Sequence, residues 1–156
     1  MTWQEVCDDP SLQNLPYKIE LDQWGRIIMS PANNRHGKRQ FRIGALLEKQ
    51  MRGGEIITEC SIDTPLGTKV ADVAWASDAF IRKHGDVTPF PAAPEICVEV
   101  KSLSNTKMDI AEKIMLYLAQ GAQEVWICDA DGNISFHNRT GIITRSVLAP
   151  AFAMKV

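Results

Sequence analysis

The amino-acid sequence predicts an α/β fold in which a mixed β-sheet is flanked by helices, with an N-terminal β-hairpin and a short C-terminal β extension. Short apolar segments rich in β-branched residues alternate with two long segments whose apolar residues recur every three or four positions. Turn-forming residues separate these segments. The 156 residues suffice for one domain. We expect a single domain over 1–156, with an N-terminal segment 1–14, a core 15–138 and a C-terminal extension 139–156.

The first elements predicted along the chain are a hairpin and a long helix. Tyr17–Leu21 and Arg26–Met29 are short strand-like segments, and turn-forming residues 22–25 lie between them. A helix is expected from about Arg35 to Arg52, and Gly53 and the glycine after it would end this helix. The apolar positions of the helix recur at helical spacing: Ile43, Leu46, Leu47 and Met51.

Three strands and an irregular segment are predicted next. Residues 55–61 and 69–75 read as two strands joined by a turn, and 95–100 is a third, apolar strand. Between them, residues 77–94 contain several prolines and predict a surface loop, with one short helical turn at about 79–82.

The last part of the chain predicts a second helix and three strands. Ser104 and Thr106 are both plausible N-caps for a helix that ends near Gly121. A buried strand at 124–129 follows, and the helix can serve as the crossover between two parallel strands. Two short strands are expected at 134–138 and 142–147.

Composition limits the classes of protein that fit. The formal net charge is −2, which argues against a protein that coats nucleic acid through bulk electrostatics. No apolar run approaches the length of a membrane helix, and the acidic N-terminus lacks the apolar region of a secretory signal. We therefore expect a cytoplasmic protein without a membrane partner. The four cysteines show no spacing typical of zinc sites, and three of them lie in predicted strands as buried thiols.

Two carboxylates interrupt predicted buried strands. Asp72 lies within an apolar strand, and Glu99 lies within the next one. A lone buried carboxylate is costly unless it is paired or binds metal. Side chains alternate along a strand, so Glu99 and Lys101 are predicted to share a face. Solvated strand charges are the alternative interpretation, and spacing alone does not decide between the two.

This pattern is typical of a site for phosphodiester hydrolysis. Mg²⁺ prefers oxygen ligands, commonly one or two carboxylates with water and phosphate. Asp72 and Glu99 can supply the carboxylates, and the carbonyl of Val100 can add a third oxygen. The ion would polarise the phosphate, and Lys101 would stabilise the charge that develops on it.

The sequence also resembles the Uma-type family of bacterial restriction endonucleases, within the PD-(D/E)XK nuclease superfamily. The resemblance runs from about residue 17 to residue 138. The matching positions occur in the family's order: Ile19–Leu21, Ile27–Pro31, His36, Ala71–Val73, Glu99–Ser102, Asp109, Lys113, Tyr117, Gly121, Glu124–Trp126 and Asp129. One departure is Ala71, where the family usually has a proline.

The resemblance implies a restriction-endonuclease-like fold and a Mg²⁺-dependent endodeoxyribonuclease, with Mn²⁺ as a substitute ion and a homodimer that cuts both strands. It assigns the metal to Asp72 and Glu99. It adds Glu20 as an upstream acidic residue, for which a solvated hairpin charge is the alternative. It also adds Lys113 as a second basic group, for which an exposed ion pair with Asp109 is the alternative.

A basic cluster at the start of the first long helix could contact DNA phosphates. Its members are Arg35, His36, Lys38, Arg39 and Arg42. An ordinary solvated helix face is the alternative, and His36 could instead lie near the metal. Two other functions remain open: a catalytically silent nucleic-acid-binding or interaction module of the same fold, and a nuclease acting on RNA or on branched or single-stranded DNA.

Overall fold

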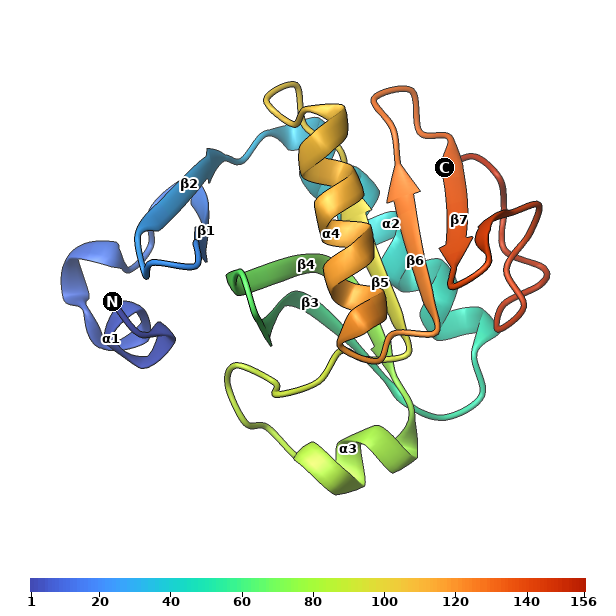
Figure 1. The fold of residues 1–156 in the computed structure, drawn as a ribbon. Coiled ribbons are helices and arrows are strands. Elements are labelled where there is room, and N and C mark those ends of the chain that lie inside the picture. Colours follow the sequence, from blue (N-terminus) through green and yellow to red (C-terminus); the bar gives the residue numbers. More distant parts are fainter.

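The computed structural model describes residues 1–156 and contains a six-stranded mixed sheet (Figure 1). The spatial order of the strands follows the sequence: β3 (Glu55–Thr64), β4 (Gly67–Ala76), β5 (Ile96–Val100), β6 (Glu124–Cys128), β7 (Ile134–Asn138) and β8 (Gly141–Ile143). Only β5 and β6 run parallel, and every other neighbouring pair is antiparallel. The predicted α/β fold with a mixed sheet is confirmed.

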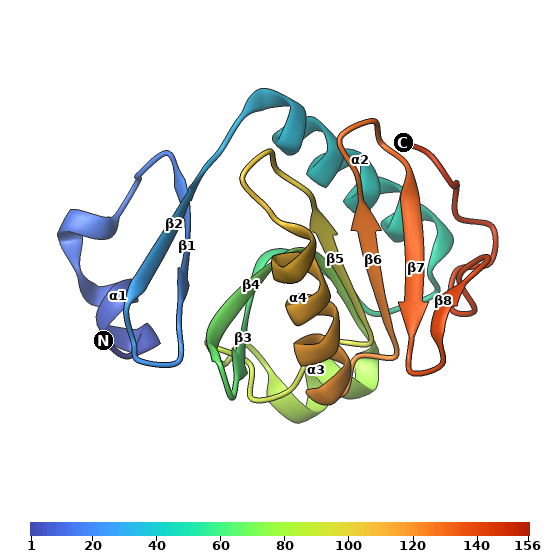
Figure 2. The same ribbon diagram turned by 45° about the horizontal axis from the view of Figure 1, so that its top comes forward.

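Two long helices cover opposite faces of this sheet (Figure 2). α4 (Lys107–Ala119) connects the parallel strands β5 and β6, as predicted, and Thr106 rather than Ser104 caps its N-terminus. α2 (Asn34–Gln50) begins at the N-cap Asn33. None of the helices has the length and apolar character needed to cross a membrane.

The sheet separates two apolar cores. Ile43 and Leu47 of α2 pack with Val73, Val98 and Trp126 on one side. On the other side, Tyr117 of α4 belongs to a cluster of buried residues that includes Cys60, Ala74, Cys97 and Val125. Alternation along β4 and β5 therefore divides their side chains between the α2 face and the α4 face.

The N-terminal hairpin forms a separate two-stranded sheet beside the main one (Figure 1). Its strands are β1 (Tyr17–Leu21) and β2 (Ile27–Pro31). The hairpin is held against β4, because the Lys69 ammonium donates to the carbonyl of Leu21 at 3.2 Å. Gly67 has a φ of 92°, and a Cβ there would clash with the backbone of Leu21 and Asp22. This close approach brings β1 over the start of β4.

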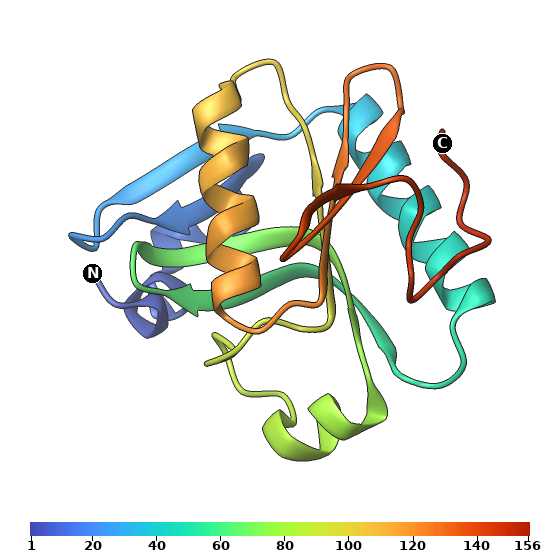
Figure 3. The same cartoon turned by 45° about the vertical axis from the view of Figure 1, so that its right-hand side comes forward.

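The structure contains one helix that the sequence did not predict and one that is longer than predicted. α1 (Trp3–Asp8) and a 3₁₀ turn at Pro10–Leu12 lie in the segment for which no structure was expected. A capping box between Thr2 and Glu5 accounts for α1. α3 (Asp78–His84), capped by Ser77, is longer than the predicted single turn (Figure 3).

The predicted strand at 142–147 is wrong beyond Ile143, where β8 ends. The backbone N–H groups of Val147 and Leu148 donate instead to the carboxylate of Glu124, at 2.7 and 3.1 Å. Ser146 donates to the same carboxylate at 2.6 Å. Side-chain capping thus replaces strand pairing in this segment.

Candidate functional site

Asp72 and Glu99 lie next to each other on two neighbouring strands, just beyond the last paired residues of β4 and β5. The last pair between β4 and β5 joins Val73 with Val98, and the next position beyond this pair is occupied by Asp72 on β4 and by Glu99 on β5. Asp72 Oδ2 accepts a hydrogen bond from the N–H of Val100 at 2.7 Å. Asp72 is fully buried and Glu99 is 3% exposed. Buried carboxylates require compensating partners.

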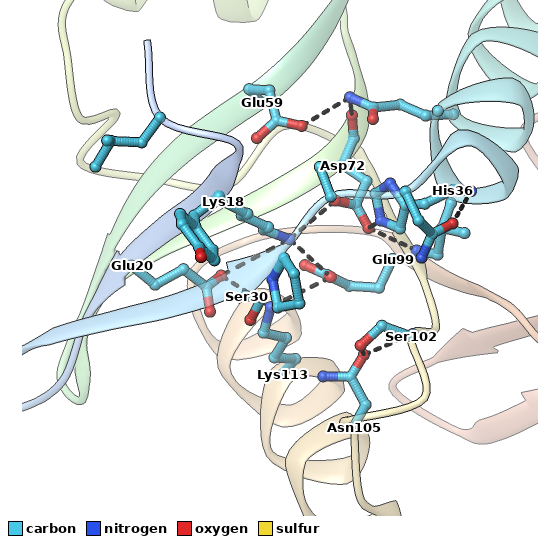
Figure 4. A pocket seen from close by; sticks show the side chains of 18 residues that line it. Lys18, Glu20, Ser30, His36, Glu59, Asp72, Glu99, Ser102, Asn105 and Lys113 are labelled. Carbon is cyan, nitrogen blue, oxygen red and sulfur yellow. Dashed lines mark hydrogen bonds and ion pairs between the residues drawn. The ribbon is translucent and has the colours of Figure 1, made fainter. Parts of the chain in front are cut away.

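Two lysines supply those partners, and a third carboxylate, Glu20, lies beside them (Figure 4). Lys18 Nζ, from β1, lies 2.9 Å from Asp72 Oδ1 and 3.2 Å from Glu99 Oε2. Lys113 Nζ, from α4, lies 2.8 Å from Glu20 Oε1 and 3.2 Å from the same Glu99 oxygen. Glu20 also accepts from the N–H of Val70 at 2.8 Å, which anchors β1 to β4. Two ammonium groups thus lie among three carboxylates.

Neutral or titratable donors hold the two central carboxylates in place. The hydroxyl of Tyr117, one turn after Lys113 on α4, donates to Glu99 Oε1 at 2.7 Å. His36 Nε2, from the first turns of α2, lies 3.2 Å from Asp72 Oδ2. Residues from α2, α4 and β1 therefore converge on the middle of β4 and the end of β5.

The edge strand β3 is interrupted opposite Asp72. Glu59 occupies that register position and has a φ of 52°, in the left-handed region that side chains other than glycine rarely adopt. The Gln40 side-chain amide donates to both the carbonyl of Asp72 and the carboxylate of Glu59, at 2.9 Å each. Backbone strain of this kind is concentrated at functional sites. Here it places a fourth carboxylate on the wall of the pocket.

Burial and neighbouring charges shift the pKa values of Asp72 and Glu99 in opposite directions. Burial raises the pKa of Asp72, but Lys18 and a hydrogen bond from His36 outweigh burial and lower it far below its ordinary value. Burial dominates at Glu99 and raises its pKa despite Lys113 and Lys18. Two carboxyl groups with separated pKa values are typical of acid and base roles in one site.

A pocket of about 290 Å³ opens onto these groups. A second pocket of about 400 Å³ adjoins it and shares residues with it, His36 and Val100 among them. Arg35, Arg39 and Lys101 line this second pocket. The Arg39 guanidinium donates to the carbonyls of Asp129 and Ala130, so it also fixes the β6–β7 turn.

The structure brings four of the five predicted catalytic residues together: Glu20, Asp72, Glu99 and Lys113. Lys101 does not join them. β5 ends at Val100, the Lys101 N–H donates to the carbonyl of Cys128 at 2.8 Å, and its ammonium forms no ion pair. Among the predicted DNA contacts, Arg35, His36 and Arg39 line the second pocket, whereas Lys38 is exposed and lines neither pocket.

Sequence reasoning missed Lys18. The signal was present, since Lys18 lies two positions before Glu20 and side chains two apart on a strand share a face. Knowing that this face is turned toward Asp72 required the position of the hairpin. Lys113 and His36, by contrast, were recognised as candidates, and both contact the central carboxylates.

The donor set is chemically suited to a divalent cation. No group of three or more His, Cys, Asp or Glu side chains is arranged as a ready-made metal site. Mg²⁺ needs fewer, because it is commonly held by one or two carboxylates and keeps several waters. Asp72 and Glu99 offer oxygens that both contact a single cation, the Lys18 ammonium. These residues therefore fit the ion that the resemblance implies.

Comparisons with known proteins agree with this fold. The model of the Uma2 family, described as "Putative restriction endonuclease", matches residues 3–147. Among solved structures, the chain is similar to "a putative nuclease belonging to DUF820" from Anabaena variabilis ATCC 29413. The TM-score is 0.77 at 17% identity, and the match covers 99% of this chain and 94% of that one. No curated protein matches the chain.

Proposed function

Because the chain belongs to the Uma2 family, whose description is "Putative restriction endonuclease", we propose that it is an endonuclease that hydrolyses phosphodiester bonds in DNA with the help of Mg²⁺. The observation that carries the proposal is the meeting of Asp72 and Glu99 with two lysines in one pocket. Mn²⁺ would substitute for Mg²⁺, since both ions take oxygen ligands.

Asp72 and Glu99 would hold the ion, with the backbone carbonyl of Val100 as a further oxygen donor. When bound, the ion supplies Lewis-acid stabilisation of the phosphate. Asp72 is suited to this role because its low pKa keeps it ionised throughout the neutral range. Tyr117 and the Val100 N–H orient the two carboxylates, so neither has to reorganise when a ligand arrives.

Lys113 is the basic residue best placed to act on the substrate. Its ammonium lies 3.2 Å from Glu99 and reaches the pocket, where it can stabilise negative charge that develops on a phosphate. Glu20 holds Lys113 in position at 2.8 Å. Lys101, in the adjoining pocket, would contact a neighbouring phosphate together with Arg35.

A cleavage assay tests this proposal. Supercoiled plasmid DNA should be nicked or linearised by the wild-type protein in Mg²⁺ or Mn²⁺ and left intact in EDTA. Glu99→Gln removes one negative charge at nearly constant shape and should abolish cleavage. The matched control is Glu112→Gln, an exposed residue of α4, which should cut like the wild type. Equal cleavage by wild type and Glu99→Gln would overturn the proposal.

The same assay separates the other substrates. Parallel reactions with single-stranded DNA, a branched DNA and RNA would reveal a nuclease with a different substrate. DNA binding without cleavage of any substrate would identify the silent module instead. Cutting both strands of a duplex calls for two active sites, so the proposal includes a homodimer, which light scattering of the protein in solution checks.

A further inference from the structure

The two lysines of the site differ in which carboxylates they join. Lys18 Nζ contacts Asp72 and Glu99, the pair assigned to the metal, at 2.9 and 3.2 Å, and lies 3.9 Å from Glu20. Lys113 Nζ contacts Glu20 and Glu99 and does not reach Asp72. Lys18 is thus the one ammonium that bridges the two predicted metal ligands (Figure 4).

Lys18 reaches this site from a different sheet than the two carboxylates. It comes from β1, which belongs to the separate hairpin, whereas the carboxylates come from β4 and β5. Its side chain is 13% exposed and lines the pocket of about 290 Å³. A flexible four-carbon stem at a pocket wall can swing without disturbing the sheet.

We propose that Lys18 is an exchangeable internal cation: it neutralises Asp72 and Glu99 in the metal-free protein and withdraws from them when a divalent ion binds. This inference rests on the proposed function. The reason is charge and space, because an ammonium and a dication cannot both lie within contact distance of the same two oxygens. Without a cation between them, the two buried carboxylates of Asp72 and Glu99 would repel each other.

The exchange has a consequence for affinity. A protein whose binding-competent state is only partly populated binds its ligand more weakly by that fraction. The state with Lys18 withdrawn is the competent one, so removing the ammonium should tighten binding of the ion. Removing Lys113 takes away the same charge nearby and leaves the Asp72–Glu99 bridge intact, which makes it the matched control.

Calorimetric titration with Mn²⁺ alone measures this difference. Lys18→Met should bind Mn²⁺ roughly tenfold or more tightly than the wild type, and Lys113→Met by less than about threefold. An equal gain in Mn²⁺ affinity in both variants would mean that Lys18 acts only as a nearby positive charge, as Lys113 does, and would overturn the exchange. If the wild type binds Mn²⁺ and Lys18→Met binds it with the same affinity, the exchange is overturned, whereas the proposed metal site is not.

A second measurement uses only the wild-type protein, so it does not depend on whether a variant folds. In the wild-type chain labelled with ¹⁵N-lysine, a buried, ion-paired Lys18 ammonium should give a slowly exchanging N–H signal. As Mg²⁺ saturates the protein, this signal should disappear or move toward the chemical shift of exposed lysines. Persistence of the signal at saturation would overturn the exchange. If Mg²⁺ and Mn²⁺ do not bind the wild type at all, both the metal-dependent function and the exchange are overturned.

Discussion

The hydroxyl of Tyr117 donates a 2.7 Å hydrogen bond to Glu99 Oε1 and leaves Oε2 to the two lysines. Both residues are buried, and burial raises the pKa of Tyr117 far above its ordinary value, so the phenol remains a donor. One helix thereby contributes both the group that orients Glu99 and, a turn earlier, the Lys113 ammonium. The α4 crossover is part of the site as well as part of the fold.

Tyr117→Phe should weaken both the fold and the activity. Loss of a hydrogen bond to a buried charged group should lower the free energy of unfolding by about 1.5–3 kcal/mol. Without this hydrogen bond the Glu99 carboxylate is less well oriented, which should also lower kcat. Urea unfolding measures the loss of stability, with Tyr17→Phe as control, because the Tyr17 side chain is exposed. Equal losses of stability in Tyr117→Phe and Tyr17→Phe would contradict the role assigned to the Tyr117 hydroxyl.

Lys113 and Lys101 should differ in their effect on catalysis. Lys113→Met removes the ammonium beside Glu99 and should lower kcat by roughly 100-fold or more, as loss of a charge-stabilising group typically does. Lys101→Met should lower kcat by less than about tenfold and act mainly on KM, because a phosphate contact outside the reacting centre positions the substrate. Steady-state cleavage rates decide this. A larger kcat defect in Lys101→Met would return the catalytic role to the sequence-predicted lysine.

The stability contributed by His36 should depend on pH in a definite direction. The hydrogen bond with Asp72 raises the pKa of His36 above its ordinary value, although burial opposes this. A raised folded-state pKa means that the folded protein binds the proton more tightly than the unfolded chain does. The resulting stability is complete below about pH 6.5, the unfolded value, and is lost as pH rises through the folded value.

His36→Gln therefore should destabilise the protein more at pH 6 than at pH 9. Urea unfolding of both proteins across this range measures the difference, in metal-free buffer. Asp72→Asn should bring the His36 pKa, followed by NMR, back toward its ordinary value. A wild-type-to-variant difference that is constant with pH would show that the imidazole is not coupled to Asp72.

The central carboxylates could be predicted because they break a simple rule: Asp72 and Glu99 interrupt apolar strands that are buried on both faces. The position of Lys101 could not, because its face depends on where β5 ends, and a strand boundary one residue earlier changes the direction of the side chain. Lys18 depends on the docking of a hairpin through Gly67 and Lys69, contacts about 50 residues apart in sequence.

The C-terminal extension was predicted least well, for a related physical reason. β-branched residues are frequent at 142–147 and favour a strand locally, but a distant carboxylate competes for the same backbone donors. Local patterns report which backbone conformation is favourable. They do not report which buried acceptor, such as Glu124, lies within reach.

This competition leads to the last prediction, that Glu124 stabilises the fold through its charge and shape. The carboxylate accepts four hydrogen bonds. Oε2 accepts from Trp126 Nε1 at 2.8 Å and from Ser146 Oγ at 2.6 Å, and Oε1 accepts from the N–H groups of Val147 and Leu148. Glu124→Ala leaves the buried donors of Trp126 and Ser146 unsatisfied and should lower the free energy of unfolding by about 3 kcal/mol or more.

Glu124→Gln is the sharper variant, because all four partners are donors and an amide must turn its NH₂ group toward two of them. It should therefore destabilise nearly as much as alanine, although it matches glutamate in size. Urea unfolding gives the stability, and amide hydrogen exchange should show lost protection at Val147 and Leu148 first. A Glu124→Gln protein as stable as the wild type would mean that packing, and not the carboxylate, holds the C-terminal segment against β6.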